Sequence, residues 1–412
     1  MVRAIFGYCI FLIASMFLAD KSNIKFNRNW KPVLFGILLQ FLVAFALTNI
    51  TACISAIEWV ARGVMKLKDA TIEGTKFCFG YIGGGDLPFD TKENSNALVF
   101  AFQVLPTIIL VSTLAATLRY LRILPVVSNI LGYVFKLIFK VKSYIGMVAV
   151  AKIFVGQLDA PLLIKNKLNT LPKSEMFTVL ALAFATASAA VMPIYSSVIE
   201  HVCPDALKHI IISSVLGVIS ALIVASIAMP NEDSNASNMS IKEKSEHTSF
   251  MDAVSRGLSD GFTVWWCVVG SLIGTVALIA LINYILDLLP NCAGEPITLQ
   301  RIFGIFMYPY AWLMGISSQD IMTVSQIIGT RLAVNETIAF FDLAKATIST
   351  ESVVKTIYAI NNFGNFSAIG ITVAGVSAMS PGQQHISSII WKAFIGGFLA
   401  TGLTATIAGI FF

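Results

Sequence analysis

Charged side chains are scarce in this chain. Asp, Glu, Lys and Arg together make up 12% of its 412 residues, whereas hydrophobic residues make up 56%. A soluble globular protein has roughly a quarter charged residues, because water must solvate its surface. The composition therefore argues against an ordinary soluble domain and predicts an integral membrane protein whose surface faces lipid.

The sequence also lacks the usual patterns of metal and nucleic-acid sites. Its four histidines form no HExxH motif and its six cysteines show no CxxC spacing, so no metal site is indicated. The cysteines lie mostly in apolar stretches, which predicts buried thiols. The net charge of +5 comes from scattered Lys and Arg rather than from a basic stripe, so nucleic acid is not expected as a partner.

Long apolar runs predict the membrane-spanning helices. A helix needs about 20 apolar residues to cross the hydrocarbon core of a bilayer. Candidate spans lie near residues 2–19, 32–56, 96–118, 175–200, 206–229, 261–289, 351–379 and 385–411.

The first apolar run is interpreted as a retained span rather than a signal peptide. A cut after Ala19 would place Phe17 at the −3 position, where cleavage sites need a small residue. The loop 20–31 carries four basic residues against one Asp. The positive-inside rule therefore places this loop in the cytoplasm and the N-terminus outside.

Some apolar regions carry too many polar residues to be simple spans. Residues 144–172 and 299–345 contain charged, amide and proline residues between short apolar arms. Irregular backbone at membrane depth is tolerated only where protein or a cavity surrounds it, so re-entrant hairpins are expected there. Residues 57–77 and 122–141 mix apolar residues with charged or aromatic ones, which predicts helices lying in the membrane interface.

Each predicted hairpin is followed by a span with a weak middle and then by a plain span. The weak middles are FATASAAVMP (184–193) and NNFGNFSAIG (361–370). A unit that occurs twice in this way indicates an inverted repeat, in which paired broken segments form a substrate site near the membrane midplane. The expected organisation is N-terminal spans with scaffold and interfacial helices (1–142), a first repeat (143–229), a polar linker (230–260), a scaffold span (261–298) and a second repeat (299–412).

The polar residues inside these regions are the functional candidates, because an ionised side chain at membrane depth costs about 3 kcal/mol to insert. They form no nucleophile–base pair, so they suit hydrogen bonding to a polar, uncharged solute better than catalysis, and no enzyme activity is expected. In the order of the chain they are Lys152, Gln157, Asp159, Asn335, Glu336, Asn361, Asn362 and Asn365.

Structural explanations exist for several of these candidates. Lys152 and Asp159 are two helical turns apart and could neutralise each other, and Glu336 could pair with Arg331. Asn361 and Asn362 could satisfy backbone groups that the helix break frees. Asp320 is interpreted as a polar cap at the interface.

Several motifs, in order from about residue 75 to the end, resemble those of the concentrative nucleoside transporters. GQLDAPLL (156–163) resembles the family's GQ(S/T)EAPLL, VNETIAF (334–340) resembles LNEFVAY, and NNFGNFSAIGI (361–371) resembles GFANFSSIGI. The resemblance implies an all-α transporter with eight spans, two re-entrant hairpins and an elevator-like mechanism. It also implies a homotrimer in the bacterial inner membrane that carries nucleosides.

The resemblance further implies roles for the matched residues. Gln157 and Asp159 stand at nucleobase contacts, with Val191 at an apolar one. Glu336 and Asn365 stand where the family holds the ribose hydroxyls, and Phe363 lines the sugar. The positions of the family's sodium site are Lys152, Val155, Thr186 and Ala187.

Four departures from the family pattern affect the expected function. Lys152 replaces an Asn that offers its oxygen to sodium, and an ammonium cannot do so, which predicts a lost sodium site with proton-coupled or uncoupled transport. Leu158 replaces a hydroxyl residue, Asp159 shortens the family's acid by one methylene, and Ala368 replaces the motif's second Ser, so the base range stays open. A same-fold transporter of another sugar-bearing solute, or a membrane sensor that binds ligand without flux, remain the alternatives.

Overall fold

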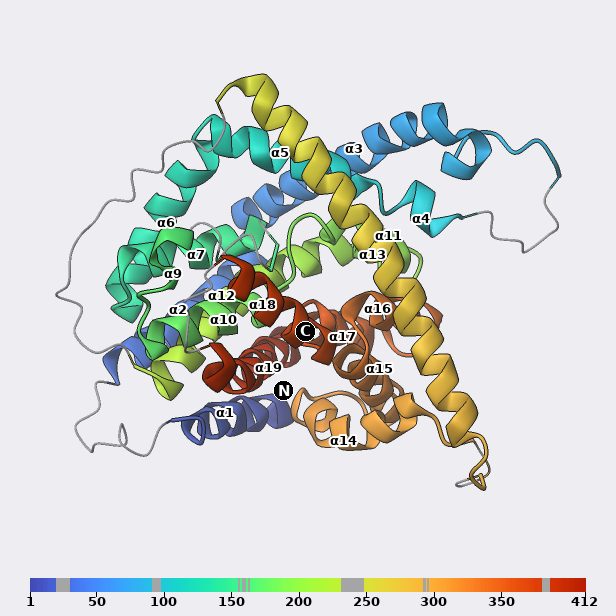
Figure 1. The fold of residues 1–412 in the computed structure, drawn as a ribbon. Helices are drawn as coiled ribbons and strands as arrows, with labels where there is room; N and C mark the ends of the chain where they lie inside the picture. Colours follow the sequence, from blue (N-terminus) through green and yellow to red (C-terminus); the bar gives the residue numbers. More distant parts are fainter. Residues whose placement is uncertain are drawn as a thin grey trace.

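The computed structural model describes residues 1–19, 30–90, 98–154, 156–157, 161, 164–230, 248–291, 294, 296–379 and 386–412. Every regular element within these residues is a helix (Figure 1). Five helical segments among them are long and apolar enough to cross a membrane: Lys31–Asn49, Phe100–Tyr120, Ala206–Ala228, Phe250–Leu286 and Ile386–Phe411. The composition and these helices together support an integral membrane protein.

The N-terminal helices differ from the expected spans at one boundary. The apolar run 32–56 is divided, because Ile50 adopts an extended backbone between two helices. The second of these helices contains the predicted interfacial segment 57–77. The helices are α1 (Val2–Met16), α2 (Lys31–Asn49), α3 (Thr51–Phe79), the 3-10 helix η2 (Gly80–Gly83), α4 (Phe100–Gln103), α5 (Thr107–Tyr120) and α6 (Ile123–Phe139).

The two halves of the chain repeat one pattern of helices. In the first half these are α7 (Ser143–Phe154), α9 (Lys165–Leu168), α10 (Lys173–Ala185), α11 (Met192–Ile199) and α12 (Ala206–Ala228). In the second half these are α15 (Ile321–Ala333), α16 (Glu336–Lys345), α17 (Thr350–Ile360), α18 (Phe366–Met379) and α19 (Ile386–Phe411). Each half thus has an interrupted hairpin region, a span divided in two, and one long helix.

The stretch between the repeats corrects two sequence-based assignments. α13 (Phe250–Leu286) begins inside the predicted linker, because Ser249 accepts a hydrogen bond from the Asp252 amide and caps the helix. The region 299–345 contains three helices rather than two hairpin arms. Its first helix, α14 (Leu299–Leu313), includes Pro309 and is followed by Gly315 with φ of +78°.

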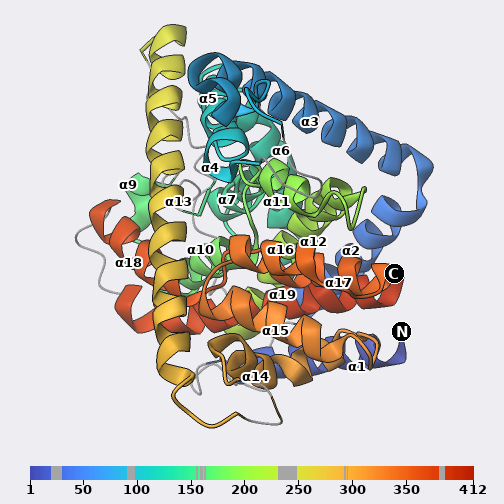
Figure 2. The ribbon, with the colours of Figure 1, turned by 90° about the vertical axis from the view of Figure 1, so that its right-hand side faces the viewer.

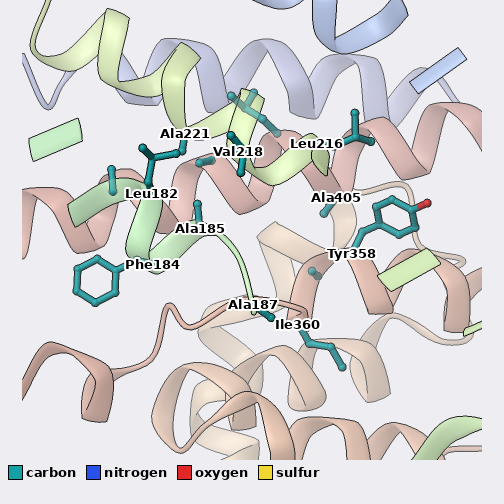
Figure 3. Packing of buried hydrophobic residues seen from close by; sticks show 14 of the residues in the cluster. Leu182, Phe184, Ala185, Ala187, Leu216, Val218, Ala221, Tyr358, Ile360 and Ala405 are labelled. Carbon is teal, nitrogen blue, oxygen red and sulfur yellow. The ribbon is translucent and has the colours of Figure 1, made fainter. Parts of the chain in front are cut away.

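The core forms where the two repeats meet. α10 packs against α19, and α17 packs against α12, so each divided span contacts the long helix of the other repeat (Figure 2). Buried residues make up 83% of the apolar window of α12 and 78% of that of α19, but only 12% of that of α13. α13 therefore lies outside the core, with its apolar side chains exposed. Figure 3 shows the core packing, in which Leu216 and Ala405 represent the two long helices.

The expectation of buried thiols is wrong for several cysteines. Cys203 is buried, but Cys9, Cys78 and Cys267 are exposed. Apolar helices in a membrane protein turn much of their surface toward lipid, so an apolar sequence context does not imply burial in protein.

Candidate functional site

The first helix break lies at residues 186–191, between α10 and α11. α10 ends at Ala185, and Thr186 follows with an extended backbone. Thr186 and Ala187 are fully buried, and Figure 3 shows Ala187 on the extended strand of chain that leaves α10. The break therefore presents backbone carbonyl groups inside the protein, where water does not satisfy them.

The second helix break lies at residues 361–365, between α17 and α18. The Asn362 Nδ2 donates to the Ala359 carbonyl at 2.9 Å, and the Gly364 amide donates to the Asn362 Oδ1 at 3.0 Å. Asn361 instead donates to α12, at 3.0 Å from the Ile210 carbonyl oxygen. Asn362 thus satisfies backbone groups that the break frees, as one of the structural explanations expected, whereas Asn361 anchors the break to the first repeat.

Glu336 lies where the second hairpin region turns from α15 into α16. Asn335 caps α16, because its Oδ1 accepts from the Ile338 amide at 3.0 Å. Glu336 is the first residue of that helix and is only 7% exposed. The positive end of a helix dipole favours a carboxylate at this position.

The Glu336 carboxylate joins the second hairpin region to α11, which follows the first break, and to the second break. Its Oε2 accepts from the Asn365 Nδ2 at 3.0 Å, and its Oε1 accepts from the Tyr195 hydroxyl at 2.8 Å. The Asn365 Oδ1 in turn accepts from the Ala368 amide at 2.8 Å and from the Ser367 hydroxyl at 2.7 Å. These bonds fix the orientation of the Asn365 amide, so that its NH2 group faces the carboxylate.

Gln157 brings the first hairpin region into the same network. Its Nε2 donates to the Ala368 carbonyl at 3.2 Å and also to the Thr372 hydroxyl. The predicted site residues Gln157, Ala368, Asn365 and Glu336 are therefore linked in one chain of hydrogen bonds. Val191 is half-buried at the start of α11, where its carbonyl accepts from the Tyr195 amide at 3.1 Å. Leu158 and Asp159 lie outside the described residues.

Lys152 lies between the two breaks. Its side chain is fully buried, and its Nζ donates to the Thr186 carbonyl at 3.1 Å. The same Nζ lies 4.8 Å from the centre of the Phe363 ring, within cation–π range. The ammonium therefore contacts one predicted sodium-site residue, while Val155 and the suggested partner Asp159 lie outside the described residues.

The suggested ion pair between Arg331 and Glu336 is wrong. No ion pair joins these two residues, both of which the structure describes; the Arg331 Nη1 donates to the Gly364 carbonyl instead. Helix α15 ends at Ala333, before Glu336, so the two side chains belong to different helices.

Asp320 is the N-cap residue of α15, but its carboxylate makes no capping hydrogen bond to that helix. It accepts from the Ser317 hydroxyl at 2.9 Å and from the Ser349 hydroxyl at 2.6 Å. Although burial raises the pKa of this carboxyl, hydrogen bonds from Ser349, Ser352 and Ser317 lower that pKa to about 2. Since Ser349 is the N-cap residue of α17, Asp320 ties the base of the second hairpin region to the divided span.

Sequence reasoning missed two residues of the site. Tyr195 follows the first break in an apolar helix, and its ring stacks on Phe340 with centroids 4.5 Å apart. Thr372 lies one turn after Ala368 in α18. A Tyr in an apolar helix could have been recognised as a candidate, because a buried Tyr hydroxyl needs a hydrogen-bond partner. The sequence did not indicate that this partner is Glu336.

Comparison with known proteins covers most of the chain. Family models described as Na+ dependent nucleoside transporter N-terminus, nucleoside recognition, and Na+ dependent nucleoside transporter C-terminus match residues 6–82, 101–201 and 209–409. An uncharacterized transporter of Haemophilus influenzae is 32% identical over 350 residues, covering 82% of this chain and 81% of that protein. Nucleoside permease NupC of Helicobacter pylori is 26% identical over 414 residues, covering 98% and 95%.

Longer relatives and solved structures match as well. Solute carrier family 28 member 3 of Homo sapiens is 27% identical over 427 residues, covering 98% of this chain but 59% of that protein. The chain thus spans about three fifths of that relative's length. The structure of CNTnw in an inward-facing substrate-bound state matches with a TM-score of 0.86 at 24% identity, covering 100% and 97% of the two chains. An outward-facing variant of CNTnw matches with a TM-score of 0.88 at 23% identity, with the same coverage. The chain therefore belongs to the concentrative nucleoside transporter family.

Proposed function

We propose that this protein carries nucleosides across a bacterial inner membrane, and that Glu336 and Asn365 hold the ribose. The observation that carries this proposal is the hydrogen-bonded pair of these two side chains, linked through Ala368 to Gln157. The network includes residues of both hairpin regions and of the second break, which is where a transporter built from inverted repeats places its substrate.

The Glu336 carboxylate has the capacity that a diol requires. An ionised carboxylate offers about four lone pairs, and the Tyr195 and Asn365 hydrogen bonds use one on each oxygen. One acceptor position per oxygen remains for two neighbouring hydroxyl groups. Charge-assisted hydrogen bonds of this kind are about twice as strong as neutral ones, so a vicinal diol gains more than a single hydroxyl.

We further propose that the Lys152 ammonium replaces the coupling sodium ion. Sodium needs oxygen ligands, whereas this position supplies a cation that already donates to the Thr186 carbonyl. A second cation beside the ammonium would be repelled, so we propose that this position no longer binds sodium. Transport is then proton-coupled or driven by the nucleoside gradient alone. The family's homotrimer and its elevator-like movement belong to the same proposal.

Uptake of labelled uridine into liposomes tests both parts separately. Uptake is measured under a sodium gradient, a proton gradient and neither, with a panel of unlabelled nucleosides and sugars as competitors. We expect uptake that ignores sodium and that nucleosides inhibit. Uptake that rises only with sodium would contradict the proposed role of Lys152 but not the substrate assignment. Neither uptake nor binding of any nucleoside would contradict the substrate assignment, and binding without uptake would instead indicate a sensor.

A Lys152→Asn variant tests the replaced ion without relying on transport. If the ammonium excludes sodium, the variant should be stabilised by sodium over choline in a thermal unfolding assay, because a ligand that binds only the folded state raises stability. Lys355→Asn is the control, since Lys355 is also buried but pairs with Glu351 and donates to the Gly315 carbonyl, away from both breaks. No sodium effect on Lys152→Asn would count against this part of the proposal.

A further inference from the structure

The two repeats carry buried cations at corresponding places. Lys152 lies two residues before the end of α7, and Arg331 lies two residues before the end of α15. Lys152 donates to the carbonyl of Thr186 in the first break, 34 residues further along the chain. Arg331 donates to the carbonyl of Gly364 in the second break, 33 residues further along. The positions match although the flanking sequences AKIF and TRLA do not.

Burying the Arg331 side chain at this position costs free energy. Its side chain is fully buried, its guanidinium lies 5.4 Å from the centre of the Phe398 ring, and its Nε and Nη2 have no hydrogen-bond partner in the described residues. Apolar residues of similar volume often replace buried charges without loss of stability. A contribution to stability therefore does not explain the arginine.

The geometry at Gly364 shows what the guanidinium does. A Cβ atom at Gly364 would lie 3.0 Å from the Arg331 Nη1 and 2.9 Å from the Asn362 Oδ1. Because Gly364 has no side chain, Arg331 can donate to its carbonyl while Asn362 accepts from its amide. The residue that follows is Asn365, whose Nδ2 donates to Glu336.

Arg331 also lies close in sequence to the other partner of that pair. It precedes Glu336 by five residues, across the turn where α15 ends and α16 begins. One side chain therefore connects the hairpin turn that carries the carboxylate to the break that carries the amide. Losing it would free the two elements to shift relative to each other.

We propose that Arg331 is a positioning residue that sets the geometry of the Glu336–Asn365 pair and thereby the selectivity for substrates with vicinal hydroxyl groups. Arg331 braces the second break through the Gly364 carbonyl, as Lys152 braces the first break through the Thr186 carbonyl. The statement about selectivity rests on the proposed function, whereas the bracing of the second break does not. Arg331 acts through Asn365 and Glu336 and does not itself touch the substrate.

The selectivity is tested by binding of uridine and 2′,3′-dideoxyuridine to the purified full-length protein. Arg331→Met should weaken uridine binding about tenfold, the loss of roughly one well-placed hydrogen bond, and change dideoxyuridine binding little. Arg331→Lys should recover part of the difference. Lys355→Met, which removes a buried cation away from the break, should leave the ratio of the two affinities unchanged.

Hydrogen–deuterium exchange tests the bracing without any ligand. Arg331→Met should speed exchange in peptides covering 361–368 and not in those covering 186–191, and Lys152→Met should do the reverse. Phe398→Leu, which removes the ring beneath the guanidinium, replaces Arg331→Met if that variant does not fold. Unchanged exchange at 361–368 would overturn the proposal. Faster exchange there in a protein that binds no nucleoside would uphold the brace and refute the proposed function.

Discussion

Replacing Tyr195 by phenylalanine removes one oxygen atom from the candidate site and keeps the ring. The hydroxyl donates to the Glu336 Oε1 at 2.8 Å in a site where Tyr195 is 1% exposed, and the ring still stacks on Phe340 after the change. A buried hydrogen bond to a charged acceptor contributes about 1.5–3 kcal/mol. Tyr195→Phe should therefore lower the free energy of unfolding by about 2 kcal/mol.

A double-mutant cycle isolates this hydrogen bond. In a Glu336→Met background the Tyr195 hydroxyl is buried without its acceptor, so removing it should cost close to nothing or stabilise the protein. The expected coupling energy is about 2 kcal/mol. Tyr358→Phe is the control, because that hydroxyl lies 3.3 Å from the His209 Nδ1 and shares no partner with Glu336.

The measurement is equilibrium unfolding of the purified protein in detergent, followed by tryptophan fluorescence. The control should be additive with Glu336→Met to within about 0.5 kcal/mol. If Tyr195→Phe costs the same in both backgrounds, the hydroxyl and the carboxylate do not interact, and the network proposed for the ribose site loses its link to the first break.

Three further predictions use the same unfolding assay. Gly364→Ala should destabilise by about 1–3 kcal/mol through overpacking and weaken uridine binding, whereas Gly370→Ala, with open space at its Cβ, should stabilise α18 by about 0.5–1 kcal/mol. Because hydrogen bonds lower the pKa of Asp320 from its usual 3.8 to about 2, its stabilisation is complete above about pH 4 and lost as the pH falls toward 2, so Asp320→Asn should flatten that part of the pH–stability profile. Lys142→Met should cost about 2 kcal/mol, because it removes the 2.7 Å ion-pair partner of Glu175, which is 2% exposed.

The helix breaks were predictable from sequence because their cause is local. Small, hydroxyl and amide residues at 184–193 and 361–370 offer the backbone alternatives to helical hydrogen bonds, and both divided spans separate within these segments. Helix ends without such residues were harder to place. Ile50 interrupts an apolar run by its backbone conformation alone, and residues 250–260 are helical because Ser249 supplies a cap.

Contacts between distant elements were the part that sequence could not supply. Arg331 was one possible partner for Glu336, but α15 ends between them and the guanidinium donates to the Gly364 carbonyl. The Glu336–Asn365 hydrogen bond joins two residues that the family resemblance assigned to one site, but the bond itself was not predicted. The Tyr195 hydrogen bond depends on how α11 packs against α16, which no local pattern encodes.

A cation that is covalently attached cannot drive transport as a dissolved ion does. A ligand shifts a conformational equilibrium only by its difference in affinity between two states, and a gradient does work only if the ion binds on one side and leaves on the other. The Lys152 ammonium stays with the protein in every state, so under the proposed function it balances local charge and holds the Thr186 carbonyl without coupling to a sodium gradient. Any coupling must then come from a proton that binds and leaves during the cycle, and if no group takes up such a proton, the protein can only equilibrate its substrate.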